Sequence, residues 1–217
     1  MLICGIDEAG RGPVIGPLVM CGVLVEQKDE EKLKNIGVKD SKLLTPNQRE
    51  GLFKKITGIA KRYKLLVIPP REIDMAVESD KINLNKLEAM KSAWIINYLS
   101  PDVAYIDCPS NNINNYTDYL KKYIFNGKIR IIAEHKADFK YPAVSAASIL
   151  AKVTRDNEIG KIKKKIGIDI GSGYPSDEVT VRFLKKYHES YPEIIRKSWA
   201  TYREIKKDQK QKKLGGY

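Results

Sequence analysis

The chain has 217 residues, which suits one large domain or a core with a small appendage, since domains usually have roughly 100–200 residues. Hydrophobic residues make up 42% and charged residues 30%, so a sizeable core is expected and global disorder is excluded. With 39 Lys and Arg against 27 Asp and Glu, the net charge of +12 favours a polyanionic partner, nucleic acid before an anionic membrane. The alternative explanation is a lysine-rich surface selected for solubility or heat tolerance.

The first elements are predicted to form a β-hairpin. Residues 2–7 are a short apolar strand, and residues 18–25 are apolar and β-branched, as in a second strand. The connection is too short for a crossover helix, so the strands are expected to pair antiparallel. Cys4 and Cys21 lie in these apolar runs and are expected to be small core residues. Three cysteines without a CxxC pair argue against a disulfide framework and against a structural zinc site.

The same region bears on targeting. The longest uncharged stretch, residues 13–25, is shorter than the roughly 20 residues that span a bilayer. No basic segment precedes the first carboxylates, so the sequence does not resemble a signal peptide. We therefore expect no membrane association and a cytoplasmic location.

The middle of the chain alternates helices with strands. Thr45, Pro46 and Gln48 form a good helix start with a capping box, and this helix is expected to run to about residue 61. A buried strand follows and stops at Pro69 and Pro70. The next expected segments are a helix over 83–99 with Trp94 and Tyr98 in its apolar period, a strand over 103–107, a helix over 112–125, a strand over 129–133 and a helix over 142–166.

This alternation indicates an α/β fold. Because the first two strands pair antiparallel, the central sheet is expected to be mixed and flanked by helices. A Gly-rich loop over 169–175 comes next, then two helices near 177–190 and 193–212 without a further strand. We expect a catalytic core over 1–170 and a C-terminal helical appendage over 171–217, which ends in a frayed basic tail after Lys206.

Carboxylates follow several of the apolar strands. Asp7 and Glu8 are adjacent at the end of the first strand, where both can serve one site only if the chain leaves the strand. Asp107 ends a buried strand, and ligand sites of open α/β sheets lie at the carboxyl ends of strands. Asp138 precedes the long helix and could cap it or complete an acidic cluster. Each of these acids could equally be an ordinary surface or capping residue.

Taken together, the four acids predict a metal site. Four carboxylates in one place repel each other unless cations lie between them. Carboxylates with little His and no paired Cys suit Mg²⁺ or Mn²⁺ better than Zn²⁺. Two such ions about 3.5–4 Å apart are a common device for phosphoryl displacement. The combination with a basic chain predicts a phosphodiesterase that acts on nucleic acid.

Six segments then carry a resemblance to a known family. They are GIDEAGRGPVIGP from Gly5, DSKLL from Asp40, YID from Tyr105, HKAD from His135, YPAVSAASILAK from Tyr141 and GSGYP from Gly171. In this order and over about residues 3–203, the sequence resembles the ribonuclease HII family in an archaeal form. The resemblance implies a ribonuclease H-like fold.

The resemblance also implies an activity and a metal site. Members cleave the RNA strand of RNA–DNA hybrids and nick 5′ of a single ribonucleotide in duplex DNA, leaving 3′-hydroxyl and 5′-phosphate ends. The implied metal ligands and catalytic residues are Asp7, Glu8, Asp107 and Asp138. Asp7 is the expected bridge between two Mg²⁺ or Mn²⁺ ions, and Asp138 is expected to hold the second ion.

Substrate contacts follow from the same resemblance. Gly10, Arg11 and Gly12 match the motif that senses the ribose 2′-hydroxyl through backbone groups, although a strained turn would also need glycine. Tyr174 matches a tyrosine that packs on the sugar, and by itself it would be an ordinary tyrosine beside a proline. The expected phosphate contacts, each otherwise a plain surface group, are Lys42, Ser148 and Lys152.

Two alternatives stay open at this point. A non-catalytic basic nucleic-acid-binding protein would fit the charge, but it would not gather carboxylates against a polyanion. Ribonuclease HIII carries an N-terminal substrate-binding domain, which is not expected here because Asp7 lies six residues after Met1. A monomer is the default expectation, and a contact with a sliding clamp cannot be read from the sequence.

Overall fold

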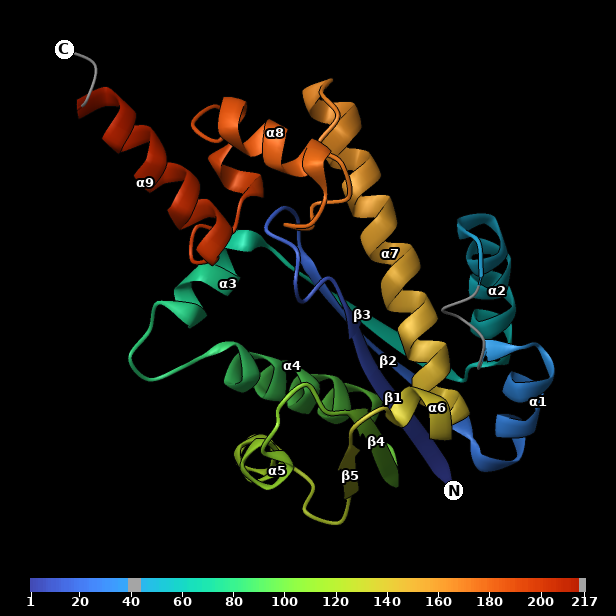
Figure 1. The fold of residues 1–217 in the computed structure, drawn as a ribbon. Coiled ribbons are helices and arrows are strands. Elements are labelled where there is room, and N and C mark those ends of the chain that lie inside the picture. Colours follow the sequence, from blue (N-terminus) through green and yellow to red (C-terminus); the bar gives the residue numbers. More distant parts are fainter. Residues whose placement is uncertain (39–43, 215–217) are drawn as a thin grey trace. The chain divides into compact units, whose positions relative to one another are not determined.

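A computed structural model describes residues 1–38 and 44–214 (Figure 1). The strands are β1 (Leu2–Ala9), β2 (Leu18–Glu26), β3 (Arg62–Ile68), β4 (Val103–Asp107) and β5 (Arg130–Glu134). The helices are α1 (Glu30–Asn35), α2 (Pro46–Ile59), α3 (Pro70–Val77), α4 (Leu84–Leu99), α5 (Ile113–Lys121), α6 (Ala137–Lys140), α7 (Pro142–Ile166), α8 (Glu178–Tyr187) and α9 (Ala200–Leu214). Two short 3₁₀ turns, η1 (Gln27–Asp29) and η3 (Pro192–Ile194), complete the described elements.

The strands form one mixed sheet in the order β3-β2-β1-β4-β5. β1 pairs antiparallel with β2 and parallel with β4, and β4 pairs parallel with β5. The predicted hairpin and the mixed α/β sheet are therefore confirmed. Because β1 and β4 run in the same direction side by side, their carboxyl ends meet at one edge of the sheet.

Two compact units interleave along the sequence. The first unit comprises Met1–Ala9, Val19–Val67 and Leu84–Arg155, and the second comprises Gly10–Leu18, Ile68–Asn83 and Asp156–Tyr217. The sequence predicts a different kind of division, into a catalytic core over residues 1–170 and an appendage over residues 171–217. This division stays a prediction.

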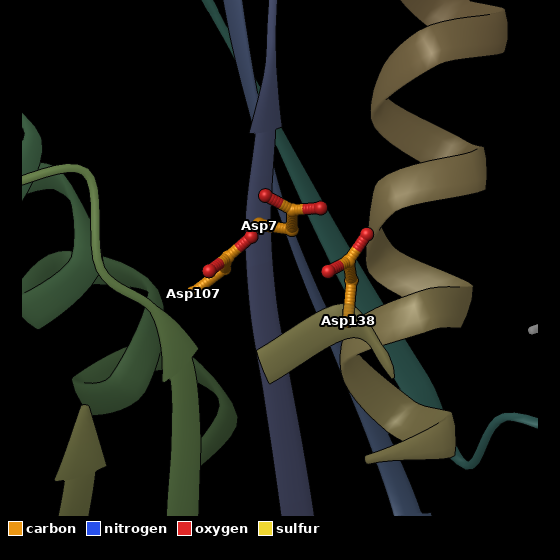
Figure 2. Close-up of side chains that lie close together, drawn as sticks. All are labelled: Asp7, Asp107 and Asp138. Atoms are coloured by element: carbon orange, nitrogen blue, oxygen red, sulfur yellow. The ribbon is translucent and has the colours of Figure 1, made fainter. Parts of the chain in front are cut away.

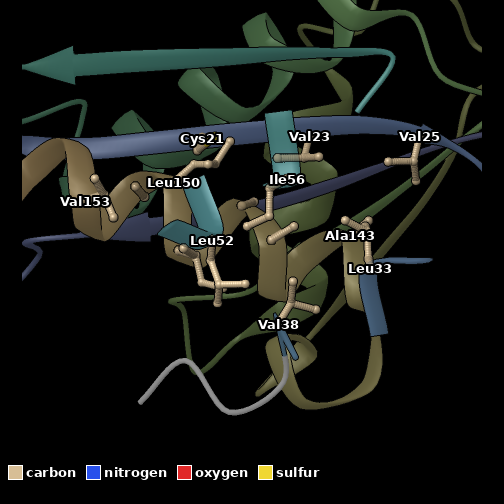
Figure 3. Close-up of a cluster of buried hydrophobic side chains, with 14 of the residues drawn as sticks. Cys21, Val23, Val25, Leu33, Val38, Leu52, Ile56, Ala143, Leu150 and Val153 are labelled. Atoms are coloured by element: carbon tan, nitrogen blue, oxygen red, sulfur yellow. The ribbon is translucent and has the colours of Figure 1, made fainter. Parts of the chain in front are cut away.

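In the first unit, α4 and α5 lie on one face of the sheet, and α2 and α7 lie on the other (Figure 1). The α7 face is a dense core in which small residues allow close approach (Figure 3). A Cβ atom on Gly5 would lie 2.1 Å from the carbonyl carbon of Ala143, so the helix backbone touches the strand at a residue that must be glycine. The small-residue face of α7 is fully buried there, and its members are Ala143, Ala146, Ala147 and Ala151. Cys4 and Cys21 are buried as predicted.

The second unit has a core of its own. The segment after β1, which the sequence predicts to be a turn between strands, buries Val14 and Ile15 completely. Ile15 forms an isolated antiparallel bridge with Ile195, so this segment pairs with a part of the chain 180 residues away. Residues of α7, α8 and α9 complete the core, among them Ile159, Phe183, Leu184, Tyr202 and Ile205.

Several predicted elements need correction. The helix expected from residue 193 begins at Ala200, because Ile195 is extended against Ile15 and the Asp74 carboxylate accepts hydrogen bonds from the Lys197 and Ser198 amides at 2.9 and 3.0 Å. This helix then continues to Leu214, where a frayed tail was expected.

The remaining differences are small. Pro70, expected to stop a strand, is also the first residue of α3, where its missing N–H costs little. The short helices α1, α3 and α6 are absent from the prediction, and α5 ends at Lys121 rather than near residue 125. Trp94 and Tyr98 are 46% and 45% exposed and stack on each other, so they are not core residues of α4. Every helix in the described ranges is too short or too polar to cross a membrane.

Candidate metal and active site

Three carboxylates converge in the first unit (Figure 2). Asp7 comes from β1, Asp107 from the last position of β4, and Asp138 from α6, and one oxygen of each lies within 4.8 Å of the others. Asp7 and Asp107 are neighbours because each follows the paired residues Ile6 and Ile106 in the parallel ladder. The sheet register thus fixes the spacing of two of the three acids.

Asp138 is brought to the same place by the segment after β5. Lys136 adopts a left-handed conformation with φ of 56°, which turns the chain into the short helix α6. The Ala137 amide donates to Asp107 at 3.2 Å, and the Ser145 hydroxyl of α7 donates to the Asp138 carbonyl. These bonds tie α6 both to β4 and to α7, so the third carboxylate is held by main-chain contacts on two sides.

Asp7 is the most buried member, with 6% of its surface exposed. Burial raises the pKa of its carboxyl group from 3.8 to about 7, and the nearby negative charge of Asp107 adds to this rise. The Ser148 hydroxyl, the Glu8 amide at 2.7 Å and the Lys152 ammonium oppose it by stabilising the carboxylate. The balance shows that the site without metal disfavours the ionised form of Asp7.

The residues present fit a divalent cation. The donors are carboxylate oxygens only, which is the ligand set that Mg²⁺ and Mn²⁺ prefer. A cation between the carboxylates would offset both the burial of Asp7 and its repulsion from Asp107. The geometry therefore agrees with the expected metal chemistry.

Glu8 lies outside this group of three. β1 continues as a regular strand to Ala9, so the side chains of Asp7 and Glu8 point to opposite faces of the sheet. Burial raises the pKa of Cys108 and Tyr116, and the negative charge of Glu8 adds to the rise in both. Its role as a metal ligand stays a prediction.

Two of the expected phosphate contacts stand beside Asp7. Ser148 is buried on α7 and hydrogen-bonds the Asp7 carboxylate. Lys152, one turn further along α7, donates to the Ser148 hydroxyl at 2.9 Å. The pair brings a positive charge and a hydroxyl to the acidic cluster, as a phosphate group approaching the cluster would require. Lys42 lies outside the described residues.

The remaining expected residues gather in the second unit. Tyr174 is 40% exposed, and a Cβ atom on Gly12 would lie 3.7 Å from its ring. The ring and the Gly10–Gly12 loop are thus neighbours, although 162 positions separate Gly12 from Tyr174. An aromatic ring that could pack on a sugar and a glycine backbone that a ligand could approach closely therefore lie side by side.

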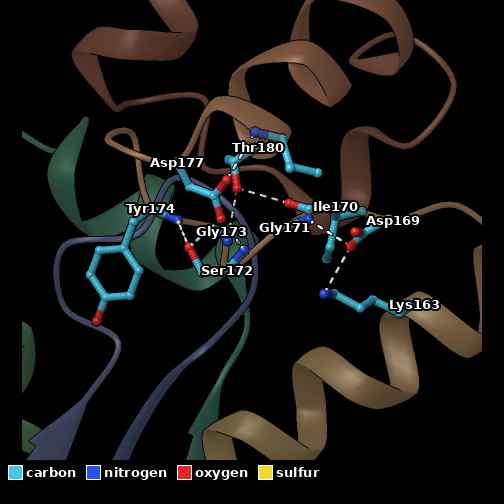
Figure 4. Close-up of polar contacts among 10 residues, drawn as sticks. Lys163, Asp169, Ile170, Gly171, Ser172, Gly173, Tyr174, Asp177 and Thr180 are labelled. Atoms are coloured by element: carbon cyan, nitrogen blue, oxygen red, sulfur yellow. Dashed lines mark hydrogen bonds and ion pairs between the residues drawn. The ribbon is translucent and has the colours of Figure 1, made fainter.

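The Tyr174 loop is held by a polar network (Figure 4). Asp177 accepts from the Ser172 amide and hydroxyl, both at 2.7 Å, and these bonds lower the pKa of Asp177 to about 2. Thr180 accepts from the Gly173 amide at 3.0 Å and donates to the Ile170 carbonyl at 2.8 Å. In the sequence, Asp177 can be recognised as the residue that caps the following helix, whereas nothing marks Thr180 as part of this network.

Arg196 is a further residue of this region, and no sequence pattern marks it. Its side chain is fully buried and donates to carbonyls of the Gly10–Gly16 segment. An arginine in a basic chain gives no sign of burial, so only the structure identifies it.

Comparisons with known proteins give relatives over nearly the whole chain. A family model described as ribonuclease HII matches residues 4–202. A ribonuclease HII of Pyrococcus furiosus is 51% identical over 98% of this chain and 95% of its own length, and one of Methanocella arvoryzae is 48% identical over 92% and 89%.

Solved structures show the same likeness. The ribonuclease H2 of Pyrococcus horikoshii superposes with a TM-score of 0.88 at 45% identity, over 97% of this chain and all of that one. The ribonuclease HII in a PCNA complex from Archaeoglobus fulgidus gives 0.83 at 41% identity, over 92% and 95%. A Bst-RNase HIII solved with Mn²⁺ gives 0.81 at 19% identity over 97% and 71%, a likeness of fold alone.

Proposed function

The chain belongs to the ribonuclease HII family and is a ribonuclease H endonuclease, and from this premise we propose how its residues divide the work. The substrates are RNA–DNA hybrids and duplex DNA with embedded ribonucleotides. Cleavage of the latter occurs 5′ of the ribonucleotide and leaves 3′-hydroxyl and 5′-phosphate ends. The observation that carries the proposal is the convergence of Asp7, Asp107 and Asp138 within 4.8 Å.

Asp7, Asp107 and Asp138 would hold two divalent ions, Mg²⁺ or Mn²⁺. Glu8, whose side chain points to the other face of the sheet here, is proposed as a fourth ligand that would join them only if the chain leaves the regular strand at the end of β1. When bound, such ions activate a water and stabilise the charge that develops on the leaving oxygen. Mn²⁺, one of the two proposed ions, is also present in the Bst-RNase HIII structure that shares this fold. Asp138 is proposed to complete the ligand set from α6.

The chain's own residues position the substrate. Lys152 is proposed to bind a phosphate beside the scissile bond, with Ser148 orienting both the phosphate and the Asp7 carboxylate. Lys42 is proposed as a further phosphate contact. In the second unit, Gly10, Arg11 and Gly12 are proposed to approach the ribose closely, and Tyr174 to pack on a neighbouring sugar.

The partners follow from the same premise. Nucleic acid is the proposed partner, in line with the charge of +12. A sliding-clamp contact is proposed because the Archaeoglobus fulgidus relative has been solved in a complex with PCNA. We further propose that the protein acts as a monomer in the cytoplasm. A non-catalytic binding protein, the alternative from the sequence, is disfavoured because the family is one of nucleases.

A hybrid-cleavage assay tests the proposal. Purified protein is stripped of metal and mixed with a labelled RNA–DNA hybrid, first with chelator and then with millimolar Mg²⁺ or Mn²⁺. We expect cleavage of the RNA strand only when a divalent ion is present. Cleavage in the presence of chelator would contradict the metal-dependent mechanism.

A further inference from the structure

One buried arginine holds three carbonyls of the loop after β1. Arg196 has no exposed surface, and its guanidinium donates to the Gly10 carbonyl at 2.6 Å, to the Arg11 carbonyl at 2.9 Å and to the Gly16 carbonyl at 3.0 Å. The guanidinium donors are fixed in one plane, so the three acceptors are fixed relative to each other. All of these groups belong to the second unit.

Trp199 holds the next carbonyl of the same loop. Its indole N–H donates to the Gly12 carbonyl at 2.9 Å, and its ring lies 4.9 Å from the guanidinium carbon of Arg196. The Arg196 amide also donates to the Val14 carbonyl at 2.9 Å, so the supporting segment is itself anchored to the loop. The consecutive carbonyls of Gly10, Arg11 and Gly12 are therefore each engaged by a side-chain donor.

These bonds set the direction of the peptide planes. A peptide bond is planar, and in the trans form its N–H points away from its C=O. All described peptide bonds are trans. Because the carbonyls of Gly10 and Arg11 point to the buried guanidinium, the amides of Arg11 and Gly12 are directed away from it. Gly10 has φ of +83°, which a side chain would strain, so the loop needs both a glycine and its external support.

The choice of residue also indicates more than space filling. Burying a guanidinium is costly unless its donors are satisfied, and an apolar side chain of similar volume would avoid this cost. Here two of the guanidinium donors act on the Gly10–Gly12 loop that is proposed to meet the ribose, and a third acts on Gly16 of the same segment. The Arg196 guanidinium can therefore stay buried without a large loss of stability only while the loop carbonyls keep the positions in which they accept its hydrogen bonds.

We propose that Arg196 and Trp199 are positioning residues that orient the Gly10–Gly12 peptide planes and thereby set the preference for ribose over deoxyribose. The inference rests on the proposed function, in which this loop approaches the ribose 2′-hydroxyl. Neither side chain touches the reacting atoms in this role. Their effect passes through the loop amides, whose directions they fix.

The test uses two conservative variants and a matched control. Trp199→Phe keeps a ring but removes the N–H donor, and Arg196→Lys keeps the charge but loses the planar donor set. Tyr202→Phe removes a hydroxyl from the same core and serves as the control. Each full-length variant is measured for melting temperature, for amide hydrogen exchange at residues 10–12, and for kcat/KM on a continuous hybrid and on a duplex with one ribonucleotide.

We expect the loop amides of Trp199→Phe to exchange faster, with the melting temperature close to that of the wild type. Activity on the single-ribonucleotide duplex should fall about fivefold, as one hydrogen bond predicts, and activity on the hybrid should fall clearly less. Arg196→Lys should give larger changes in the same direction. Tyr202→Phe should leave the ratio of the two activities unchanged.

The outcomes separate the inference from the proposed function. If the wild type does not nick the single-ribonucleotide duplex, the proposed function fails, and the inference fails with it. If the wild type nicks it but Trp199→Phe loses both activities in equal proportion, or leaves exchange at residues 10–12 unchanged, the positioning role alone is overturned. Should Arg196→Lys not fold, Trp199→Phe still decides the question.

Discussion

The acidic cluster of the first unit and the Gly10–Gly12 loop of the second unit are built in different ways. Asp7 and Asp107 are placed by neighbouring strands of a sheet, and α6, which carries Asp138, is tied to Asp107 by a hydrogen bond from the Ala137 amide. The loop is irregular, and its shape depends on side-chain donors from Arg196 and Trp199. The difference teaches that the regular sheet positions the carboxylates that are proposed to hold the metal ions. Long-range side-chain hydrogen bonds instead fix the shape of the loop that is proposed to recognise the ribose.

The largest expected effect comes from a substitution that disables the acidic cluster and leaves the Gly10–Gly12 loop unchanged. Asp7→Asn removes the central carboxylate of the cluster while keeping its shape, and we expect hybrid cleavage to fall by at least about a thousandfold. Affinity for the hybrid and the fold should be retained, because asparagine keeps the size of the side chain and an oxygen that can accept from the Glu8 amide. Turnover and binding should be measured on the same sample.

Asp118→Asn is the matched control for this change. It removes the same charge from an exposed position on α5, outside the acidic cluster. It should leave cleavage unchanged. Activity of Asp7→Asn within about tenfold of the wild type would rule out its central role.

The next largest effect is expected from substitutions of Tyr174, which lies beside the Gly10–Gly12 loop and outside the acidic cluster. Tyr174→Ala should reduce nicking at a single ribonucleotide by about tenfold or more and reduce hybrid cleavage less, because the single site has one productive register and a hybrid has many. Tyr174→Phe should fall between the wild type and Tyr174→Ala on the single-ribonucleotide duplex. Rates on both substrates and a melting curve for each variant check this.

Tyr98→Ala provides a comparison of equal exposure in the first unit, since the two tyrosines are 45% and 40% exposed. It should not change the ratio of the two activities. Equal fractional losses on both substrates in Tyr174→Ala, with a lower melting temperature, would mean that Tyr174 is only structural.

A pH series sharpens the account of the first region. The pKa of Asp7 is raised from 3.8 to about 7 in the folded protein. The folded state therefore binds the proton more tightly, so its contribution to stability is present below about pH 4 and is lost as the pH rises through 7. Without metal, the melting temperature of the wild type relative to Asp7→Asn should fall by about 5–10 °C between pH 5 and pH 8.

Metal should reverse this loss. Millimolar Mg²⁺ or Mn²⁺ at pH 8 should raise the melting temperature of the wild type by mass action and raise that of Asp7→Asn less. Calorimetric melts at both pH values, with and without metal, provide the measurement. An equal gain in both proteins would place the bound metal elsewhere.

The smallest expected effect concerns α9 rather than either site. Replacing Lys206 and Lys207 by Gln should weaken binding to hybrid and to plain duplex alike, by about threefold, and make the salt dependence of binding shallower. The cleavage position should not change, because phosphate contacts do not read sequence. A matched pair, Lys54→Gln with Lys55→Gln on α2, is equally exposed. If the salt dependence of binding stayed the same after the α9 substitutions and changed only after the α2 substitutions, α9 would not contact nucleic acid.

The two regions also differ in how far the sequence predicts them. Asp7, Asp107 and Asp138 follow apolar strands or precede a long helix, and the topology of an α/β sheet brings such positions together. Thr45 and Gln48 form the expected capping box for the same kind of local reason. Local patterns thus suffice where a regular element does the positioning.

Arg196 shows why the rest could not be predicted. Its acceptors Gly10 and Gly16 lie 186 and 180 residues away in the sequence, and no local pattern announces such a bond. Ile195 is extended for the same reason, which explains why the helix expected from residue 193 begins at Ala200. Trp94 and Tyr98 fit a helical period but are exposed, because periodicity does not report which neighbours an element has.

The most direct test of the division of labour is to map the cut on a duplex with one ribonucleotide, using wild type and Asp7→Asn side by side with an all-DNA duplex. The account predicts a single nick 5′ of the ribonucleotide by the wild type, with 3′-hydroxyl and 5′-phosphate ends, dependent on a divalent ion and lost in Asp7→Asn. A nick at a deoxyribonucleotide, a nick in the presence of chelator, or an undiminished nick by Asp7→Asn would contradict it.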